Sequence, residues 1–227
     1  MNQPVYVHKI NTGTKKQYKT LQILFAFSLS LFIILASVKL TLMIKPLYYF
    51  DIEYLSIENQ SDFSKAEIVK NYDYVINYML SPKVQEFKLP SIPYSKYGQI
   101  HFKDVKRIFT TIDILLIITG FLSTIGLTIN IRRKTFYFIK QTSSMLILLP
   151  IVLLTALVIN FDRAFVLFHK IFFRNDYWQF DPAIDPIINI LPQEFFYHSA
   201  LLIIILIVLS SIVLKILYKR LTIRKQV

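Results

Sequence analysis

The sequence predicts an all-α integral membrane protein with four transmembrane helices, a small mixed extracytoplasmic subdomain, and both termini in the cytoplasm. Three observations support this fold class. The chain is 54% hydrophobic with a mean hydropathy of +0.48, which is too apolar for a soluble single domain. Four apolar runs are long enough to cross a bilayer core, which takes about 20 helical residues. Basic residues are spread unevenly between the segments that connect these runs.

The predicted spans are the four apolar runs at 22–44, 108–131, 142–160 and 196–217. The first follows several lysines, as the core of a signal peptide would. It is too long for one, however, and it lacks a small-residue cleavage site, so we interpret it as a retained anchor. The connecting segments predicted to be cytoplasmic are 1–21, 132–141 and 218–227. Those predicted to be extracytoplasmic are 45–107 and 161–195.

The basic residues give the predicted orientation. The N-terminal tail and the loop between the second and third runs each hold four Lys or Arg residues, and the C-terminal tail holds five when Lys215 at the end of the last run is counted with it. None of the three holds Asp or Glu. The other two loops hold twelve basic and thirteen acidic residues. Because cytoplasmic loops are enriched in Lys and Arg, the three basic segments are expected inside the cell. The net charge of +12 then reflects topology and attraction to anionic lipid, and no nucleic-acid partner is expected.

Two charged residues fall inside the predicted spans. Lys39 lies about one and a half turns from the outer end of the first span, and Asp113 about one turn from the outer end of the second. An unpaired charge at such a depth costs about 3 kcal/mol, so we predict that the two side chains pair. The alternative is that each extends separately to the interface.

The first outer segment is expected to mix extended and helical structure. Residues 47–57 are rich in Tyr, Ile and Phe, which favours extended backbone. Ser64 and Glu67 have the spacing of a capping box, which predicts a helix that continues to about Leu80. Prolines then break the chain until His101, which leads into the second span.

The second outer segment begins with an aromatic stretch, residues 161–173, that is apolar nearly all round. We expect it to lie along the outer interface or to fold back into the mouth of the bundle. Asp162 and His169 are seven residues apart, so a helix would place them on one face. Asp181 and Asp185 are each followed directly by a proline, and the simplest interpretation is that they shape turns.

Few residues are candidates for chemistry. The chain has no cysteine, which excludes disulfides, thiolate catalysis and cysteine-based zinc sites. It has no Gly-x-Ser-x-Gly elbow, no glycine-rich phosphate loop and no His-Glu-x-x-His pair, so neither a metal nor another cofactor is expected. His101, His169 and His198 lie near the outer face, and His198 is most simply an interfacial ring. Imidazole titrates near neutrality, which suits it to moving protons between reacting groups.

Two sequence elements resemble those of a known family. They are His101-Phe-Lys-Asp104-Val-Lys106, and Phe168-His169-Lys-Ile-Phe-Phe-Arg-Asn175-Asp176-Tyr177-Trp178 with the Asp181-Pro182 and Asp185 that follow. Both resemble elements of Lit, the lipoprotein intramolecular transacylases of low-GC Gram-positive bacteria. The resemblance covers essentially the whole chain and is weakest over residues 48–97. It departs from the family at Phe102, where the family pattern has Met.

The resemblance implies an enzyme of the cell membrane with its active site on the outer face. Its substrate would be a lipoprotein with an N-terminal S-(diacylglyceryl)cysteine, and its other partners would be membrane lipids. The sn-2 acyl chain would move from the glycerol to the cysteine's α-amino group, which gives a lyso-form lipoprotein without a cofactor or a covalent acyl-enzyme. The two histidines taken as catalytic in the family correspond to His101 and His169.

The neighbouring residues suit supporting roles in that reaction. We expect His101 and His169 to divide the base and acid steps, in an order that the sequence leaves open. Asp104 or Asp162 would orient one imidazole, as carboxylates do.

The polar residues after His169 complete the expected site. Asn175, Tyr177 or Trp178 would donate a hydrogen bond to the tetrahedral oxyanion, and Asp176 is a further supporting candidate. The alternative for Trp178 is a residue of the interfacial aromatic belt.

Three other functions fit the sequence less well. A non-enzymatic membrane protein that binds lipids or lipoproteins would not need both histidines. A transporter subunit usually has polar residues at mid-depth, and the first and last spans have almost none. Other membrane acyltransferases usually have a His-x-x-x-x-Asp spacing, which is absent around His101.

Overall fold

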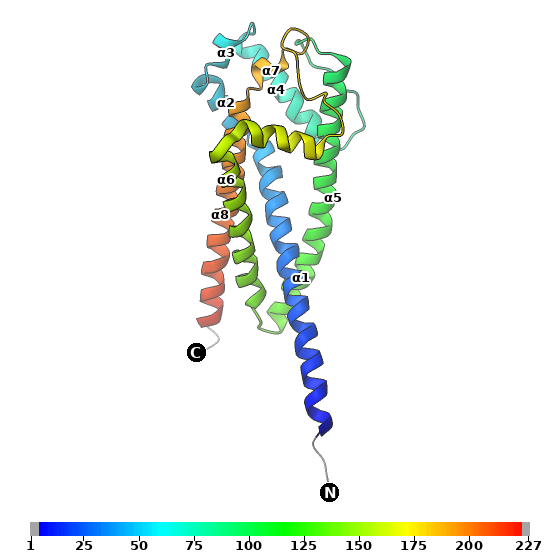
Figure 1. The fold of residues 1–227 in the computed structure, drawn as a ribbon, viewed down its shortest axis with the longest axis vertical. Coiled ribbons are helices and arrows are strands. Elements are labelled where there is room, and N and C mark those ends of the chain that lie inside the picture. The colour runs from blue at the N-terminus through cyan, green and yellow to red at the C-terminus, as the bar shows by residue number, and fades with distance from the viewer. Residues whose placement is uncertain (1–4, 224–227) are drawn as a thin grey trace. The chain divides into compact units, whose positions relative to one another are not determined.

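The computed structural model describes the backbone of residues 5–223, and the side chains of residues 19–223 except 149, 153 and 156. The ends of both predicted tails, residues 1–4 and 224–227, lie outside the described residues, as do the side chains of Lys9, Lys15 and Lys16. Within the described range the fold consists of helices, without strands (Figure 1). They are α1 Val5–Met43, α2 Lys45–Tyr54, α3 Ile57–Gln60, α4 Lys65–Leu80, α5 Lys96–Arg132, α6 Tyr137–Phe172, α7 Ile187–Ile190 and α8 Gln193–Ile223.

Three helical segments are long and apolar enough to cross a membrane: Lys19–Met43, Lys96–Arg132 and Gln193–Ile223. A fourth candidate is the bent pair of limbs within α6, Tyr137–Val152 and Leu157–Phe172, if the two together count as one span. The all-helical membrane class is therefore as the sequence predicted, with three spans by this criterion and a fourth that depends on the bend.

The chain divides into two compact units, and α1, α5, α6 and α8 each contribute to both. Unit 1 comprises Met1–Ala36, Leu115–Ile151 and Leu206–Val227, and unit 2 comprises Ser37–Ile114 and Val152–Ile205. All 14 Asp and Glu residues of the sequence belong to unit 2. Half of the 26 Lys and Arg residues belong to unit 1, which therefore carries only positive charge.

In unit 1 the long helices are joined by small polar residues. The Ser28 hydroxyl donates to the carbonyl of Thr119 at 3.1 Å, and the Ser143 hydroxyl donates to the carbonyl of Ser211 at 3.0 Å. A Cβ on Gly126 would lie only 2.7 Å from the ring of Phe25, so the glycine permits a close approach. Small residues and interhelical hydrogen bonds of this kind stabilise helix packing where the surroundings are apolar.

Unit 2 has its core between the short helices. The ring of Tyr48 in α2 stacks on Tyr72 in α4, with centroids 3.7 Å apart, and its hydroxyl donates to the carbonyl of Ile190 in α7. The capping box at the start of α4 is confirmed, because Ser64 and Glu67 each accept from the other's backbone N–H. The helix ends at Leu80, as predicted.

The prediction of extended structure over residues 47–57 is wrong, and with it the mixed character of the outer subdomain. This stretch instead forms α2 and the start of α3, separated by Ser56 in a left-handed conformation with φ 52°. Tyr48, Asp51 and Ile52 are the buried residues of α2, and their spacing of three and four places them on one helical face. Burial of this face outweighs the weak preference of Tyr and Ile for strands.

The charges within the predicted spans pair, as the sequence predicted. The Lys39 ammonium lies 2.7 Å from Asp113 Oδ1 and 2.8 Å from Oδ2, and both residues belong to unit 2. The alternative, in which each side chain extends separately to the interface, does not occur.

Candidate active site

His101 lies in the second turn of α5. The start of this helix is held in place by Ser95 and Asp185, two residues that precede or lie far from the helix in sequence. Ser95 caps the helix, since its hydroxyl accepts from the backbone N–H of Gly98 at 2.9 Å. The carboxylate of Asp185 accepts from both the amide and the hydroxyl of Ser95 at 2.7 Å. A Cβ on Gly98 would lie 2.4 Å from Asp185 Oδ1, so only glycine fits this contact. Asp185 therefore does more than shape a turn, whereas Asp181 accepts locally from Ala183 N at 2.9 Å.

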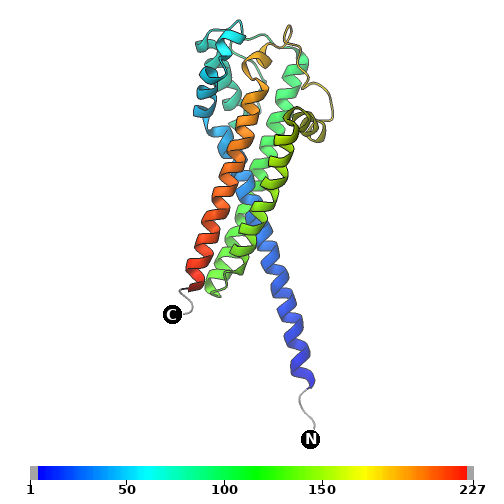
Figure 2. The same ribbon diagram turned by 60° about the vertical axis from the view of Figure 1, so that its left-hand side comes forward.

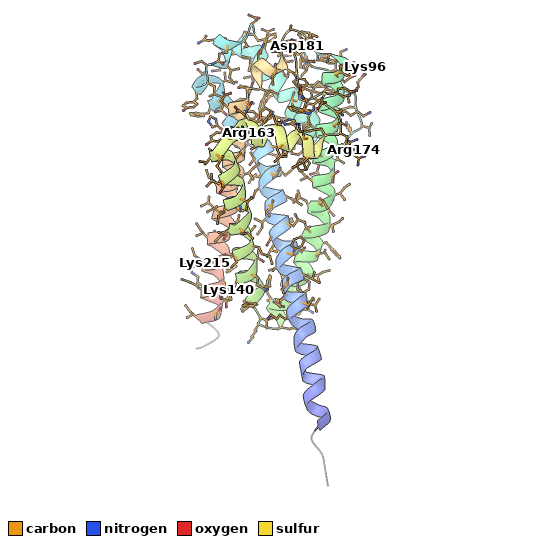
Figure 3. The ribbon with its side chains drawn as sticks, in the orientation of Figure 1. Lys96, Lys140, Arg163, Arg174, Asp181 and Lys215 are labelled. Carbon is orange, nitrogen blue, oxygen red and sulfur yellow. The ribbon has the colours of Figure 1, made fainter. Side chains whose placement is uncertain are left out.

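His169 lies near the end of the second limb of α6. The helix is interrupted at Asn160, whose backbone is non-helical and whose side-chain oxygen accepts from the N–H of Arg163 at 2.8 Å. Within unit 2 the limb runs crosswise to the first turns of α5, with Arg163 near one end and Arg174 just beyond the other (Figures 1, 2 and 3). The crossing brings His169 close to α5.

The structure brings the two predicted histidines together. The ring centroids of His101 and His169 are 6.1 Å apart, and the rings are tilted by 31°. Phe173 contacts both, with its centroid 4.8 Å from His101 and 5.5 Å from His169. The side chains are only 7% and 9% exposed, so aromatic rings rather than water surround the pair.

The hydrogen bond of His169 fixes its tautomer. Its Nδ1 lies 2.8 Å from the carbonyl oxygen of Phe165. Because a carbonyl oxygen only accepts, Nδ1 carries the proton and the neutral ring has its lone pair at Nε2. Its orienting partner is thus a backbone carbonyl, and neither of the two carboxylates that the sequence suggested for one of the imidazoles, Asp104 and Asp162.

Two buried polar atoms at this place lack a partner among the residues that the structure describes: Nδ1 of His101 itself and Nε1 of the neighbouring Trp178. The Trp178 ring stacks on His169 with centroids 4.6 Å apart, and Phe180 meets His101 edge-on at 5.3 Å. A buried polar group without a partner costs about 1–3 kcal/mol. Two of them at one place indicate a site where a ligand supplies the missing partners.

The other predicted site residues are distributed around this pair. Asp104, one turn after His101, accepts from the Asn175 side-chain amide at 3.0 Å and pairs with Arg107 at 3.1 Å. The backbone N–H of Tyr177 donates to the Asn175 side-chain oxygen at 3.2 Å, and the Tyr177 ring stacks on Tyr97. These contacts tie the segment after α6 to α5.

The contacts that the structure gives Asp176 and Asp162 are with residues other than the two histidines. The side chain of Asp176 is exposed, and its carbonyl accepts from the N–H of Gln179 in a turn. Asp162 accepts from the Gln193 side chain at 2.7 Å. It lines a separate cavity of about 420 Å³, together with Tyr54, Leu55, Phe161, Gln193, Glu194, Tyr197 and His198.

A second histidine pairing was missed by sequence reasoning. His198 is not simply an interfacial ring, because its Nδ1 lies 2.8 Å from Oδ1 of Asp51, which is completely buried. Burial raises the pKa of the Asp51 carboxyl, and the contact with His198 opposes this rise. The available signal was Asp51, one of two carboxylates within the aromatic stretch that became α2.

The chain is similar to known proteins over most of its length. Residues 23–196 match the family model described as lipoprotein intramolecular transacylase Lit. No curated protein sequence matches significantly. The solved structure of the membrane-integral lipoprotein intramolecular transacylase Lit from Bacillus cereus is 36% identical, with 93% of this chain and 99% of that chain covered and a TM-score of 0.91.

Two further structures are of variants of that Bacillus cereus protein, in which one histidine is replaced by arginine or by alanine. Both are 35% identical to this chain, with TM-scores of 0.88 and 0.87. The first covers 96% of this chain and 98% of that chain, and the second 95% and 99%. The family match over well over half of the sequence, and these structural matches, show that this chain belongs to the Lit family of lipoprotein intramolecular transacylases.

Proposed function

We propose that this chain moves the sn-2 acyl chain of a lipoprotein's N-terminal S-(diacylglyceryl)cysteine to the α-amino group of that cysteine. The product is a lyso-form lipoprotein. The observation that carries the proposal is the pair of buried imidazoles, His101 and His169, whose ring centroids are 6.1 Å apart on two different helices. Membership of the Lit family supports the same reaction.

The donor ester and the acceptor amine belong to one molecule, so the reaction needs no acyl carrier. Well-oriented intramolecular reactions reach effective molarities of about 10⁵ M or more, so proximity supplies much of the acceleration. The bond from the amine nitrogen to the acyl carbon forms as the bond from that carbon to the glycerol oxygen breaks. One proton must move from the nitrogen to the oxygen.

The two histidines divide this proton transfer. Because the Phe165 carbonyl holds the proton of His169 at Nδ1, Nε2 is the nitrogen that accepts the amine's proton. His169 passes this proton to His101, which gives it to the departing glycerol oxygen, so that both rings begin and end the reaction neutral.

Trp178 is the donor best placed to stabilise the tetrahedral oxyanion. Its Nε1–H is buried, has no partner in the described part of the chain, and belongs to a ring stacked on His169. Asn175, the alternative donor, already gives its amide to Asp104. A preorganised donor aimed at the developing negative charge stabilises the transition state more than the substrate.

The charge distribution supports an active site on the outer face. Unit 2, which contains both histidines, has all the acidic residues, whereas unit 1 has only basic ones. Lys and Arg concentrate on the cytoplasmic side of membrane proteins, so unit 1 is assigned to the inner side and both termini to the cytoplasm.

The proposal is tested with a diacylated reporter lipopeptide and mass spectrometry with fragmentation, which locates each acyl chain. His101→Ala and His169→Ala should each abolish the N-acylated product. His198→Gln is the matched control, because His198 is also a histidine of unit 2, partly buried, but pairs with Asp51. Unchanged product from both alanine variants would refute catalysis by the histidines and leave a lipid- or lipoprotein-binding protein.

A further inference from the structure

Unit 1 contains a pocket of about 330 Å³ that the acyl transfer does not use. It lies between the middle of α1, the turn from α5 to α6, and the last turns of α8. Its lining is basic, hydroxylated and aromatic, and consists of Lys19, Gln22, Lys134, Thr135, Phe136, Tyr137, Tyr218 and Thr222. No acidic residue belongs to unit 1, so nothing within this unit neutralises the two lysines.

The pocket wall has a buried acceptor without a donor. Gln22 is only 3% exposed, and its Oε1 has no partner among the side chains that the structure describes. The orientation of its amide is fixed, because Nε2 donates to Asn130 Oδ1 at 2.6 Å. Asn130 is fixed in turn, since its own Nδ2 donates to the carbonyl of Gly126 at 2.7 Å. A ligand with a hydroxyl or an N–H group would supply the donor that Gln22 Oε1 lacks.

The backbone at Lys134 suggests that its charge matters. The N–H of Thr135 donates to the carbonyl of Asn130, and the N–H of Lys134 donates to that of Ile131, which together end α5 in a Schellman motif. Lys134 occupies the left-handed position of this motif, with φ 51°. Glycine is the usual residue there, and a residue with a Cβ costs about 1 kcal/mol more. A lysine at this position places a cation on the pocket wall at a cost in stability.

We propose that this pocket binds the headgroup of an anionic glycerophospholipid, a phosphodiester that carries a hydroxylated glycerol. The phosphate lies between the ammonium groups of Lys19 and Lys134, and a glycerol hydroxyl donates to Gln22 Oε1. Basic pockets between transmembrane helices bind phosphate headgroups in this way. Leu21, Leu24 and Leu217 are exposed apolar residues that lie within two positions of a pocket-lining residue along the chain. They provide a surface for the acyl chains.

The test is native mass spectrometry of the full chain in detergent, titrated with phosphatidylglycerol. The variant Lys19→Ala with Lys134→Gly removes both charges, and the glycine suits the backbone at position 134. The matched control removes Lys140 and Lys215, which are exposed lysines of the same unit outside the pocket lining (Figure 3). We expect the pocket variant to bind phosphatidylglycerol about 25-fold more weakly, roughly fivefold per lysine, and the control to be unchanged. Equal losses in the two variants would overturn the site.

Two further arms identify the ligand. Gln22→Met keeps the side-chain length without the acceptor, and it should weaken phosphatidylglycerol about fivefold. It should leave phosphatidylmethanol, which has the same phosphodiester without a hydroxyl, unaffected. Equal weakening of both lipids would overturn the hydroxyl contact. Soluble glycerol phosphate should bind at least tenfold more weakly than the lipid, and equal binding would overturn a lipid as the occupant. Thermal melting of each variant checks that the fold is intact.

Discussion

Asp185 holds the start of α5 through Ser95, whose amide and hydroxyl both donate to its carboxylate at 2.7 Å. Gly98, three residues further on, packs directly against Asp185 Oδ1. Because His101 lies one turn after Gly98, this contact fixes the place from which the imidazole enters the site. Asp185 is a positioning residue, since it acts on the site through the helix.

A double-mutant cycle tests this contact. Asp185→Ala should lower the free energy of unfolding by about 2 kcal/mol, because it leaves two donors of Ser95 without an acceptor. Gly98→Ala alone should cost a similar amount, about 1–3 kcal/mol, since its Cβ collides with the carboxylate. In the Asp185→Ala background the same change should be neutral or stabilising. Thermal melting in detergent measures all four proteins, and additive losses would contradict the direct contact.

Trp178→Phe should separate hydrogen bonding from stacking. Phenylalanine keeps an aromatic ring against His169 but lacks the Nε1–H that we assign to the oxyanion. We expect kcat to fall about 100-fold with little change in KM, because the lost donor acts mainly in the transition state. The reporter lipopeptide assay measures both constants. An unchanged kcat would show that Trp178 only covers the histidine.

Local sequence signals predicted much of this structure. Hydropathy identified the long helices, because the length and apolar composition that a membrane-spanning helix needs can be read from the segment alone. The capping box at Ser64 and Glu67 is a signal confined to four residues. The Lys39–Asp113 pair was predictable because each charge is isolated within an apolar stretch. The two histidines of the candidate site were identified from short motifs that resemble a known family.

The contacts missed by sequence reasoning are those between distant segments. Asp185 and Ser95 are 90 residues apart, and His198 and Asp51 are 147 apart, so no local pattern links either pair. The helix α2 was missed for a related reason. Its aromatic residues favour strands weakly, and the helix is stabilised by tertiary burial of its inner face, which includes the stacking of Tyr48 on Tyr72.

Removing both charges of the Lys39–Asp113 ion pair should destabilise the chain less than removing Asp113 alone. Asp113→Asn leaves the Lys39 ammonium, whose side chain is 15% exposed, without its counter-charge. We expect a loss of about 1 kcal/mol, since Asp113 is partly exposed. Adding Lys39→Met should recover most of this loss, because no charge remains to be compensated. Melting temperatures of the single and double variants measure the coupling, and additive losses would refute it.

The Asp51 carboxyl should make stability depend on pH. Burial holds its pKa above the ordinary aspartate range near 4, so the folded state favours the protonated form. Its stabilising contribution is complete below that ordinary range and is lost as the pH rises through the raised pKa. Asp51→Asn removes this dependence. The wild-type chain should therefore lose stability relative to Asp51→Asn as the pH rises above about 4. Parallel melting curves at every pH would contradict the assignment.

Single cysteines test the proposed orientation, because the chain has none of its own. Val84 is fully exposed in unit 2, and Lys140 is exposed in unit 1. In intact cells, a membrane-impermeant maleimide should label Val84→Cys and spare Lys140→Cys. After permeabilisation both should react, which controls for the accessibility of each thiol. If the labelling pattern were reversed, unit 2 would face the cytoplasm, where the histidine pair would not meet substrates anchored in the outer leaflet.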